Sequence, residues 1–204
     1  ARIAELDGEH PGAPARAMTM EDKPRLHEPV IFLRGNPNLR GTKVPRQFLE
    51  VASPETRTAF RNGSGRLELA EAIVDPHNPL TARVFVNRLW MHHFGRPLVD
   101  TPSDFGVRAK TPTHPELLDW LSAEFIESGW SVKHLHRLIL KSATYQQSSY
   151  IHGDTAELDP ENRLLGRMNL RRLELEPVRD SMLFVTGLID QQQGGLAAPM
   201  FTNT

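Results

Sequence analysis

Cysteine is absent from all 204 residues of the sequence. The chain therefore cannot form disulfide bonds, thiolate metal sites or cysteine nucleophiles, and it cannot attach c-type haem covalently. This absence leaves the redox compartment open. Lysine is also scarce, because only five of the 24 basic residues are lysines. Arginine supplies most of the positive charge, and its planar guanidinium suits bidentate pairing with carboxylates.

Long apolar runs are absent as well. No stretch approaches the roughly 18 to 20 apolar residues of a membrane-spanning helix, so we expect no membrane span in this chain. The first residues, beginning at Ala1, contain no signal-like apolar stretch, which favours a piece excised from a longer protein. The formal net charge of -1 and the lack of a basic and aromatic stripe argue against a nucleic-acid partner.

Familiar catalytic motifs are missing too. The sequence has no GxSxG, no HExxH and no glycine-rich phosphate loop, which argues against the corresponding hydrolases, zinc peptidases and nucleotide enzymes. A pair of carboxylates for glycoside hydrolysis could be assembled from several acidic residues, but the sequence does not fix their separation. These residues are Asp104, Glu116, Asp119 and Glu124.

Composition divides the chain into three parts. Residues 1–62 are rich in Pro, Gly and charge and are predicted to form an extended, linker-like segment that packs on the domain. Two short apolar runs in this segment, residues 30–33 and 47–51, are candidate strands of one loose hairpin. Residues 63–190 are predicted to form a helical domain. Residues 191–204 are interpreted as a tail that continues into a further part of the protein.

Helical signals are regular from Ser64 onward. Helices are predicted to begin with caps at Ser64, Asn78 and Ser131, with a Thr113/Glu116 capping box, and at the sequence DPEN of residues 159–162. A last helix is predicted over residues 174–189, with Leu175, Val178, Met182, Val185 and Ile189 on one stripe. The connections are short, which favours a packed all-α array in which successive helices contact one another. The predicted fold is mainly α: about six packed helices preceded by an extended N-terminal segment with at most a small β hairpin.

The segment NPLTARVFVNRLWMHHFG, residues 78–95, is predicted to form a helix with polar residues on its apolar faces. With successive residues about 100° apart, Arg88 and His92 share a narrow polar wedge and are predicted to face solvent. Arg83 and Asn87 fall among apolar residues and should be substantially buried. Because buried polar groups need partners, we expect them to hold the proline-rich loop of residues 96–112. Asp104 in that loop is the predicted ion-pair partner.

The histidines can be interpreted either as a ligand or metal site or as structural residues. A pocket under the loop could bind a ligand or metal, but adjacent His92 and His93 diverge around the helix, so we expect no metal site. His93 is then a core histidine with a satisfied ring, and His134, His136 and His114 lie on separate helix faces. Residues 169–180 carry the densest charge. Arg172, Glu176 and Arg179 are spaced as a ladder of helix-surface ion pairs, with an arginine-lined anion or partner site as the alternative.

Three long segments carry a family resemblance. They contain NPLTARVFVNR and TPSDFG, SATYQQS, and DPENRLLGRMNLRRLELEPVRDSM, in that order. From about Val30 through Asp180 the chain closely resembles the PSD-type domain of unknown function (DUF1553) of planctomycete and related bacterial proteins. The family motif matches residues Asn87, Arg88, Trp90, Phe94, Gly95, Asp104, His114, Trp120, Trp130, His134 and Tyr145, without assigning a role to any of them.

The resemblance implies a setting. Such domains usually follow a cytochrome c-type module in an exported multidomain protein, so an extracytoplasmic location is expected. Haem c is expected only in the separate module, and this chain is expected to hold no cofactor. The expected partners are other domains of the same protein, with a polysaccharide as a further candidate.

Two functions remain open from the sequence. The leading hypothesis is a non-catalytic helical scaffold or interaction module of a cytochrome c-linked protein that handles electrons or polysaccharide. The alternative is an extracytoplasmic hydrolase acting on a glycan, with Asp104, His114 and His134 as catalytic residues. A third hypothesis is a non-covalent haem site at His93 or His134. Arg83, Asn87, Arg88, Trp90, His93 and Tyr145 are candidates for structural or ligand-contact roles.

Overall fold

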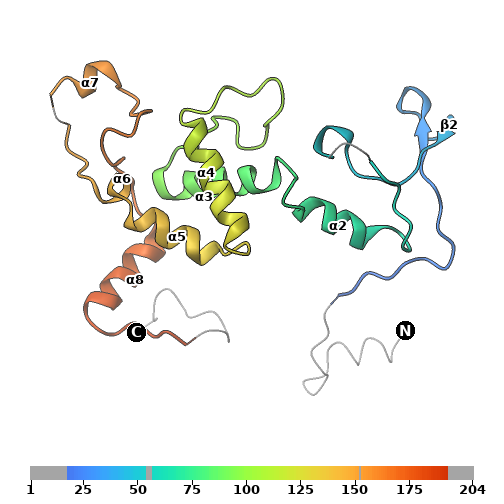
Figure 1. Ribbon diagram of the computed structural model, residues 1–204. Coiled ribbons are helices and arrows are strands. Elements are labelled where there is room, and N and C mark those ends of the chain that lie inside the picture. Colours follow the sequence, from blue (N-terminus) through green and yellow to red (C-terminus); the bar gives the residue numbers. More distant parts are fainter. Residues whose placement is uncertain (1–17, 54–56, 152, 193–204) are drawn as a thin grey trace.

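The computed structural model describes residues 18–53, 57–151 and 153–192. The chain is mainly helical with one small β hairpin near its N-terminus, as predicted (Figure 1). The helices are α2 (Arg66–Val74), α3 (Thr81–Phe94), α4 (Pro115–Glu127), α5 (Val132–Lys141), α6 (Ala143–Gln146), α7 (Thr155–Leu158) and α8 (Leu175–Val185). None of the described helices is both long and apolar enough to cross a membrane.

The hydrophobic core lies where α3, α4 and α5 meet. Each of these helices contributes side chains that are almost fully buried, for example Val86, Leu121 and Leu135. Aromatic rings fill the space between the helices, with Phe85 of α3 stacked on Phe125 of α4 at a centroid distance of 4.7 Å. Burying each such apolar side chain contributes about 1.5–3 kcal/mol. The stability of the domain is therefore concentrated in these three helices.

Asn87 of α3 joins the core to the following loop. Its side chain is fully buried, and its Nδ2 donates to the carbonyl oxygen of Val99 at 3.2 Å. Its Oδ1 accepts the backbone N–H of the same residue at 2.9 Å. Both hydrogen bonds bind the backbone of one loop residue, so Leu98 and Val99 are held inside the core. The prediction that Asn87 is buried and holds the loop is confirmed.

The hairpin forms with a different partner from the predicted one. β1 (Val30–Phe32) pairs antiparallel with β2 (Arg40–Lys43) and not with residues 47–51. The 3-10 turn Leu33–Gly35 directly follows β1 and begins the reversal of the chain toward β2. Gln47 instead forms an isolated bridge with Ala59, and Glu50–Ala52 is a 3-10 turn. β2 pairs with β1 in place of residues 47–51 because the shorter connecting loop costs less closure entropy.

Helix starts follow backbone geometry more than cap residues. α2 begins after Gly65, which has φ 80°, and Ser64 does not cap it. A Cβ at Gly65 would lie 2.7 Å from the Phe60 Cβ, so a side chain does not fit there. The predicted Thr113/Glu116 capping box is also wrong, because the N–H and hydroxyl of Thr113 both donate to the carbonyl of Leu98. Ser131 does cap α5, as predicted.

Residues 159–162 do not open a helix, which corrects the sequence prediction. The carboxylate of Asp159 accepts the backbone N–H groups of Arg163 and Leu164, each at 2.8 Å. Asn162 adopts φ 51°, and its buried side chain donates to the carbonyl of Arg167. These side chains replace helical hydrogen bonds with a turn centred on Asn162, as Asp and Asn commonly do.

α8 is shorter and more exposed than predicted. It spans Leu175–Val185, and none of its residues is buried. Side chains of the predicted inner stripe lie in solvent, with Met182 66% and Val185 84% exposed. The expected tail of residues 191–204 lies almost wholly outside the described residues.

We predict that Asn87→Leu lowers the free energy of unfolding by about 2–5 kcal/mol. The reason is that the N–H and carbonyl of Val99 each lose a buried hydrogen-bond partner, at about 1–3 kcal/mol per group. Urea denaturation followed by circular dichroism measures the change. Asn62→Leu, at an exposed position, is the matched control and should change stability by less than about 1 kcal/mol. Equal stability of the two variants would contradict the structural role of Asn87.

Candidate functional site

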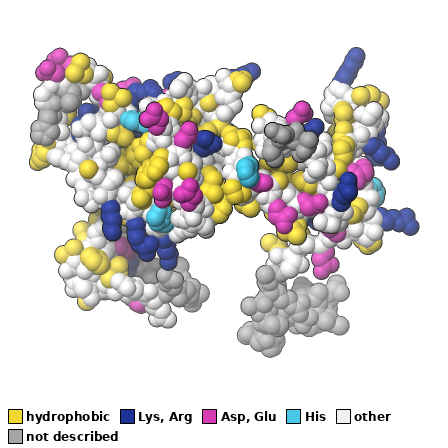
Figure 2. Space-filling view, in the orientation of Figure 1, with side chains coloured by type: hydrophobic (Ala, Val, Ile, Leu, Met, Phe, Trp, Pro, Cys, Tyr) yellow, Lys and Arg dark blue, Asp and Glu magenta, His cyan; other side chains and the backbone are white. Residues whose placement is uncertain are grey.

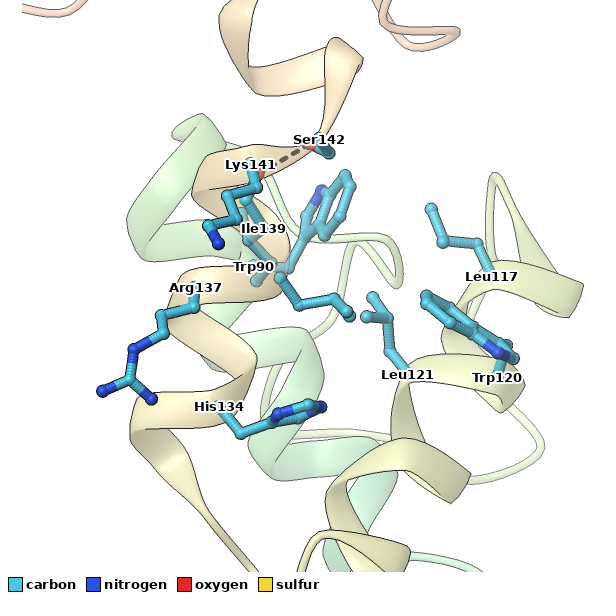
Figure 3. Close-up of a pocket in the computed structure, with 10 residues that line it drawn as sticks. Trp90, Leu117, Trp120, Leu121, His134, Arg137, Ile139, Lys141 and Ser142 are labelled. Carbon is cyan, nitrogen blue, oxygen red and sulfur yellow. Dashed lines mark hydrogen bonds between the residues drawn. The ribbon is translucent and has the colours of Figure 1, made fainter.

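An apolar pocket of about 460 Å³ lies between α3, α4 and α5 (Figure 3). Its volume is within the range of pockets that accept ligands. Trp90 of α3 forms part of the lining, and Leu117, Trp120 and Leu121 of α4 lie across from it. Trp120 is 50% exposed, although the indole is the largest apolar side chain that the chain can bury. The pocket thus presents an aromatic surface at its mouth.

Two polar side chains of the lining, Ser142 and His134, already have partners. The Ser142 hydroxyl donates to the carbonyl of Ile139 at 2.6 Å, the bond drawn in Figure 3. The His134 Nε2 lies 3.2 Å from a Glu124 carboxylate oxygen on α4. Leucine, isoleucine and tryptophan side chains supply most of the remaining lining, so the pocket offers apolar and aromatic surface.

Cations of α5 stand beside this pocket. Arg137 and Lys141 contribute to its lining, and the Arg137 side chain extends along the side of α5 that faces away from Trp120 (Figure 3). Lys133 lies one turn earlier, so the three cations are spaced four residues apart on one helix face. All three are exposed, and none forms an ion pair with a described carboxylate. We call Lys133, Arg137 and Lys141 the α5 basic row.

A second polar cluster joins α3 to α5 and α6. His93 Nε2 lies 2.8 Å from His136 Nδ1, so one ring donates a hydrogen bond to the other. Tyr145 meets the His93 ring edge-on, with a centroid distance of 5.7 Å. Burial lowers the pKa of His93, and nearby His136, Arg171 and His92 lower it further. His93 therefore has a partner for its ring, as expected, and favours the neutral form.

The residues after the Asn162 turn cap the end of α3. Arg171 donates to the carbonyl oxygens of His92 and His93, and Asn169 Nδ2 donates to that of Phe94 at 2.9 Å. The last carbonyls of a helix need such donors and carry partial negative charge. The predicted ladder of Arg172, Glu176 and Arg179 is not formed in the described part of the chain, where Arg179 lies 3.8 Å from Asp180.

Arg83 has a different partner from the predicted one. Its Nε donates to Asp119 of α4 at 2.7 Å, and a second nitrogen donates to the carbonyl of Pro79. Asp104 is therefore not its ion-pair partner. The Arg83 side chain is 37% exposed, so it is partly buried. Arg88 and His92 face solvent, as predicted.

The three candidate catalytic residues have separate partners. Asp104 accepts the N–H of Gly106 within its own turn. His114 Nδ1 lies 3.0 Å from the neighbouring Thr113 hydroxyl, and His134 pairs with Glu124. No hydrogen bond joins any two of the three. Across residues 18–53, 57–151 and 153–192, no three His, Cys, Asp or Glu side chains gather as ligands for a metal ion.

The pocket itself was not predicted from the sequence. Two signals point toward it in retrospect: an exposed position for Trp120 opposite the buried face of α4, and the four-residue spacing of the α5 basic row. Helical periodicity assigns a tryptophan to a face but does not show that the face borders a hollow. Trp90 was a candidate contact residue, and the structure places it in the lining.

Comparison with known proteins supports the family resemblance. The family PSD1, described as a protein of unknown function (DUF1553), matches residues 65–203. The resemblance drawn from the sequence starts earlier, at about Val30, and ends at Asp180. No curated protein and no solved structure was found to match the chain.

We predict that His93→Gln reduces the loss of stability on acidification. The lowered pKa of His93 means that the unfolded chain binds more protons as the pH falls below about 6.5. The contribution of neutral His93 to the free energy of unfolding is therefore fully present above this pH and is lost as the pH falls below it. Glutamine keeps a hydrogen-bonding side chain but does not titrate. Unfolding free energies at pH 7.5 and 5.5 measure the difference, with exposed His27→Gln as the control. An unchanged pH dependence would contradict the assigned role.

Proposed function

The chain belongs to the PSD1 family of proteins of unknown function (DUF1553), and on that premise we propose that it is a non-catalytic interaction module. It packs against other domains of a larger exported protein that carries a cytochrome c-type module. The module positions those domains for electron transfer or for handling polysaccharide. Haem c belongs to the separate module, because this chain has no cysteine to attach it.

One observation carries this proposal: the polar groups that resemble a reaction site are used to hold the fold. Asn87 holds the Val99 backbone, and Arg83 joins α3 to α4 through Asp119. Asp104 stabilises its own turn, and His134 joins α5 to α4 through Glu124. A catalytic constellation instead needs a nucleophile or base aimed at a shared reacting position.

The apolar surface of α2 supports an interface with another domain. Leu67, Leu69, Ile73 and Val74 are all 40% exposed or more, and α2 has no buried residue. Exposed apolar side chains gathered on one short helix are the kind of surface that another domain can cover. Phe32 of the hairpin is also about half exposed. Contact with another domain would remove these side chains from water.

We predict slower amide hydrogen exchange in α2 within the intact parent protein than in the isolated chain. Burial of the Leu67 and Ile73 side chains under a second domain would hold the helix closed more of the time. Hydrogen exchange with mass spectrometry of both proteins measures the difference, and core helix α4 serves as the internal control. Leu67→Glu/Ile73→Glu should abolish the extra protection, and Glu71→Gln should leave it. Identical α2 exchange in both proteins would overturn the proposed interface.

We also predict that the isolated chain releases no reducing ends from polysaccharides. Asp104, His114 and His134 have separate partners, so they do not combine as acid and base. A reducing-sugar assay on neutral and acidic polysaccharides compares the chain with its Asp104→Asn/His114→Ala/His134→Ala variant. Release by the unmodified chain that the variant lacks would show a hydrolase and exclude the non-catalytic proposal.

A further inference from the structure

We infer that a second pocket, at the C-terminal end of α3, binds the phosphate or sulfate group of a small ligand. The pocket has a volume of about 600 Å³ and lies between the last turn of α3 and residues 169–172, which lead to α8. We call it the α3-end pocket. This inference goes beyond the proposed function, which concerns the surface of α2.

The ionisable side chains of the α3-end pocket are all basic. They are His92, Arg96, Arg171 and Arg172, and among the described residues neither Asp nor Glu contributes to the lining. The whole chain carries a formal net charge of -1, so this concentration of positive charge does not reflect a generally basic protein. Figure 2 shows Lys and Arg side chains gathered in the region of α5 and α8. The pocket therefore favours a negatively charged ligand.

The neighbours of these arginines cancel only part of the positive charge. Arg96 pairs with Glu161 at 3.1 Å. Arg171 donates to carbonyl oxygens at the end of α3, where the helix carries roughly half a negative charge. Arg172 is exposed and forms no ion pair with a carboxylate that the structure describes. A positive excess remains in the pocket, and an anion would neutralise it.

The Arg171 side chain is held in place before any ligand binds. Its Nη1 donates to the carbonyl oxygens of His92 and His93. Its aliphatic part lies against Gly95, because a Cβ at that glycine would be 3.5 Å from the Arg171 Cδ. A guanidinium has five N–H donors, and the hydrogen bonds that Arg171 makes with described residues all come from Nη1. Its Nε and Nη2 are therefore open to a ligand.

The arrangement of the arginines favours a tetrahedral oxyanion. The planar fork of arginine donates two parallel hydrogen bonds to such a group, as it does to phosphate. Arg96 follows α3, whereas Arg171 and Arg172 belong to the segment before α8. A phosphate or sulfate group presents oxygens in several directions and can meet donors from both segments, whereas the oxygens of a carboxylate lie in one plane. Met91 and Leu170 add apolar surface for the organic part of a ligand.

Isothermal titration calorimetry of the full chain at low ionic strength tests the inference. The probe is sucrose octasulfate, which is expected to bind, and sucrose is its neutral counterpart, which is not. Arg172→Gln should weaken binding about tenfold or more, because it removes a charge-assisted hydrogen-bond donor. Arg108→Gln, at an exposed arginine of the loop between α3 and α4, is the matched control and should bind normally. Circular dichroism checks that both variants keep the fold.

Inorganic phosphate and sulfate distinguish the two sources of the anion. Binding of these ions within about tenfold of the affinity for the sulfated sugar would show that the free ion is sufficient. Binding of the sugar alone would show that an organic ligand carries the group. Both results support the site.

NMR titration of the unmodified chain locates the bound probe without any substitution. The amides of Met91, Gly95 and Leu170 should shift on addition of sucrose octasulfate, and those of α4 should not. Absence of binding, shifts confined to the α5 basic row, or equal affinities of Arg172→Gln and Arg108→Gln would each overturn the inference. None of these results would affect the proposed interface of α2.

Discussion

The hydrogen bonds between Asn87 and Val99 determine how the rest of the domain closes. A side-chain amide in the middle of an apolar helix costs a few kcal/mol unless both its donor and its acceptor are used. Here both are used by one residue of the following loop, which places Leu98 and Val99 in the core. The carbonyl of Leu98 then accepts from Thr113 just before α4. The loop between the two helices is therefore fixed near both of its ends.

This closed core explains why apolar surface remains on both sides of it. α3, α4 and α5 use their apolar faces against one another, and the ion pair from Arg83 to Asp119 and the contact from His134 to Glu124 join the same helices. α2 and α8 lie outside this unit and bury none of their own residues. This arrangement, a closed core with exposed apolar helices at its sides, is the one on which the proposed interaction module rests.

Much of the central unit could be predicted from the sequence. The end of α3 at Gly95, the cap at Ser131 and the buried role of Asn87 all follow from local rules of helix geometry and hydrogen bonding. Contacts between side chains on different helices could not be predicted in this way. Arg83 pairs with Asp119 because α4 packs across α3, whereas the sequence favoured nearby Asp104. The same limit applies to the pocket, since periodicity places Trp120 on a face but does not show what lies opposite it.

The exchange of the Val99 backbone amide with solvent tests the central claim most directly. If Asn87 holds this loop residue closed, the Val99 amide should exchange only when the whole core unfolds, with the same free energy as the amides of α3. Residue-resolved hydrogen exchange by NMR provides both values in one experiment. Exchange of the Val99 amide as fast as that of exposed amides in the same loop would contradict the account.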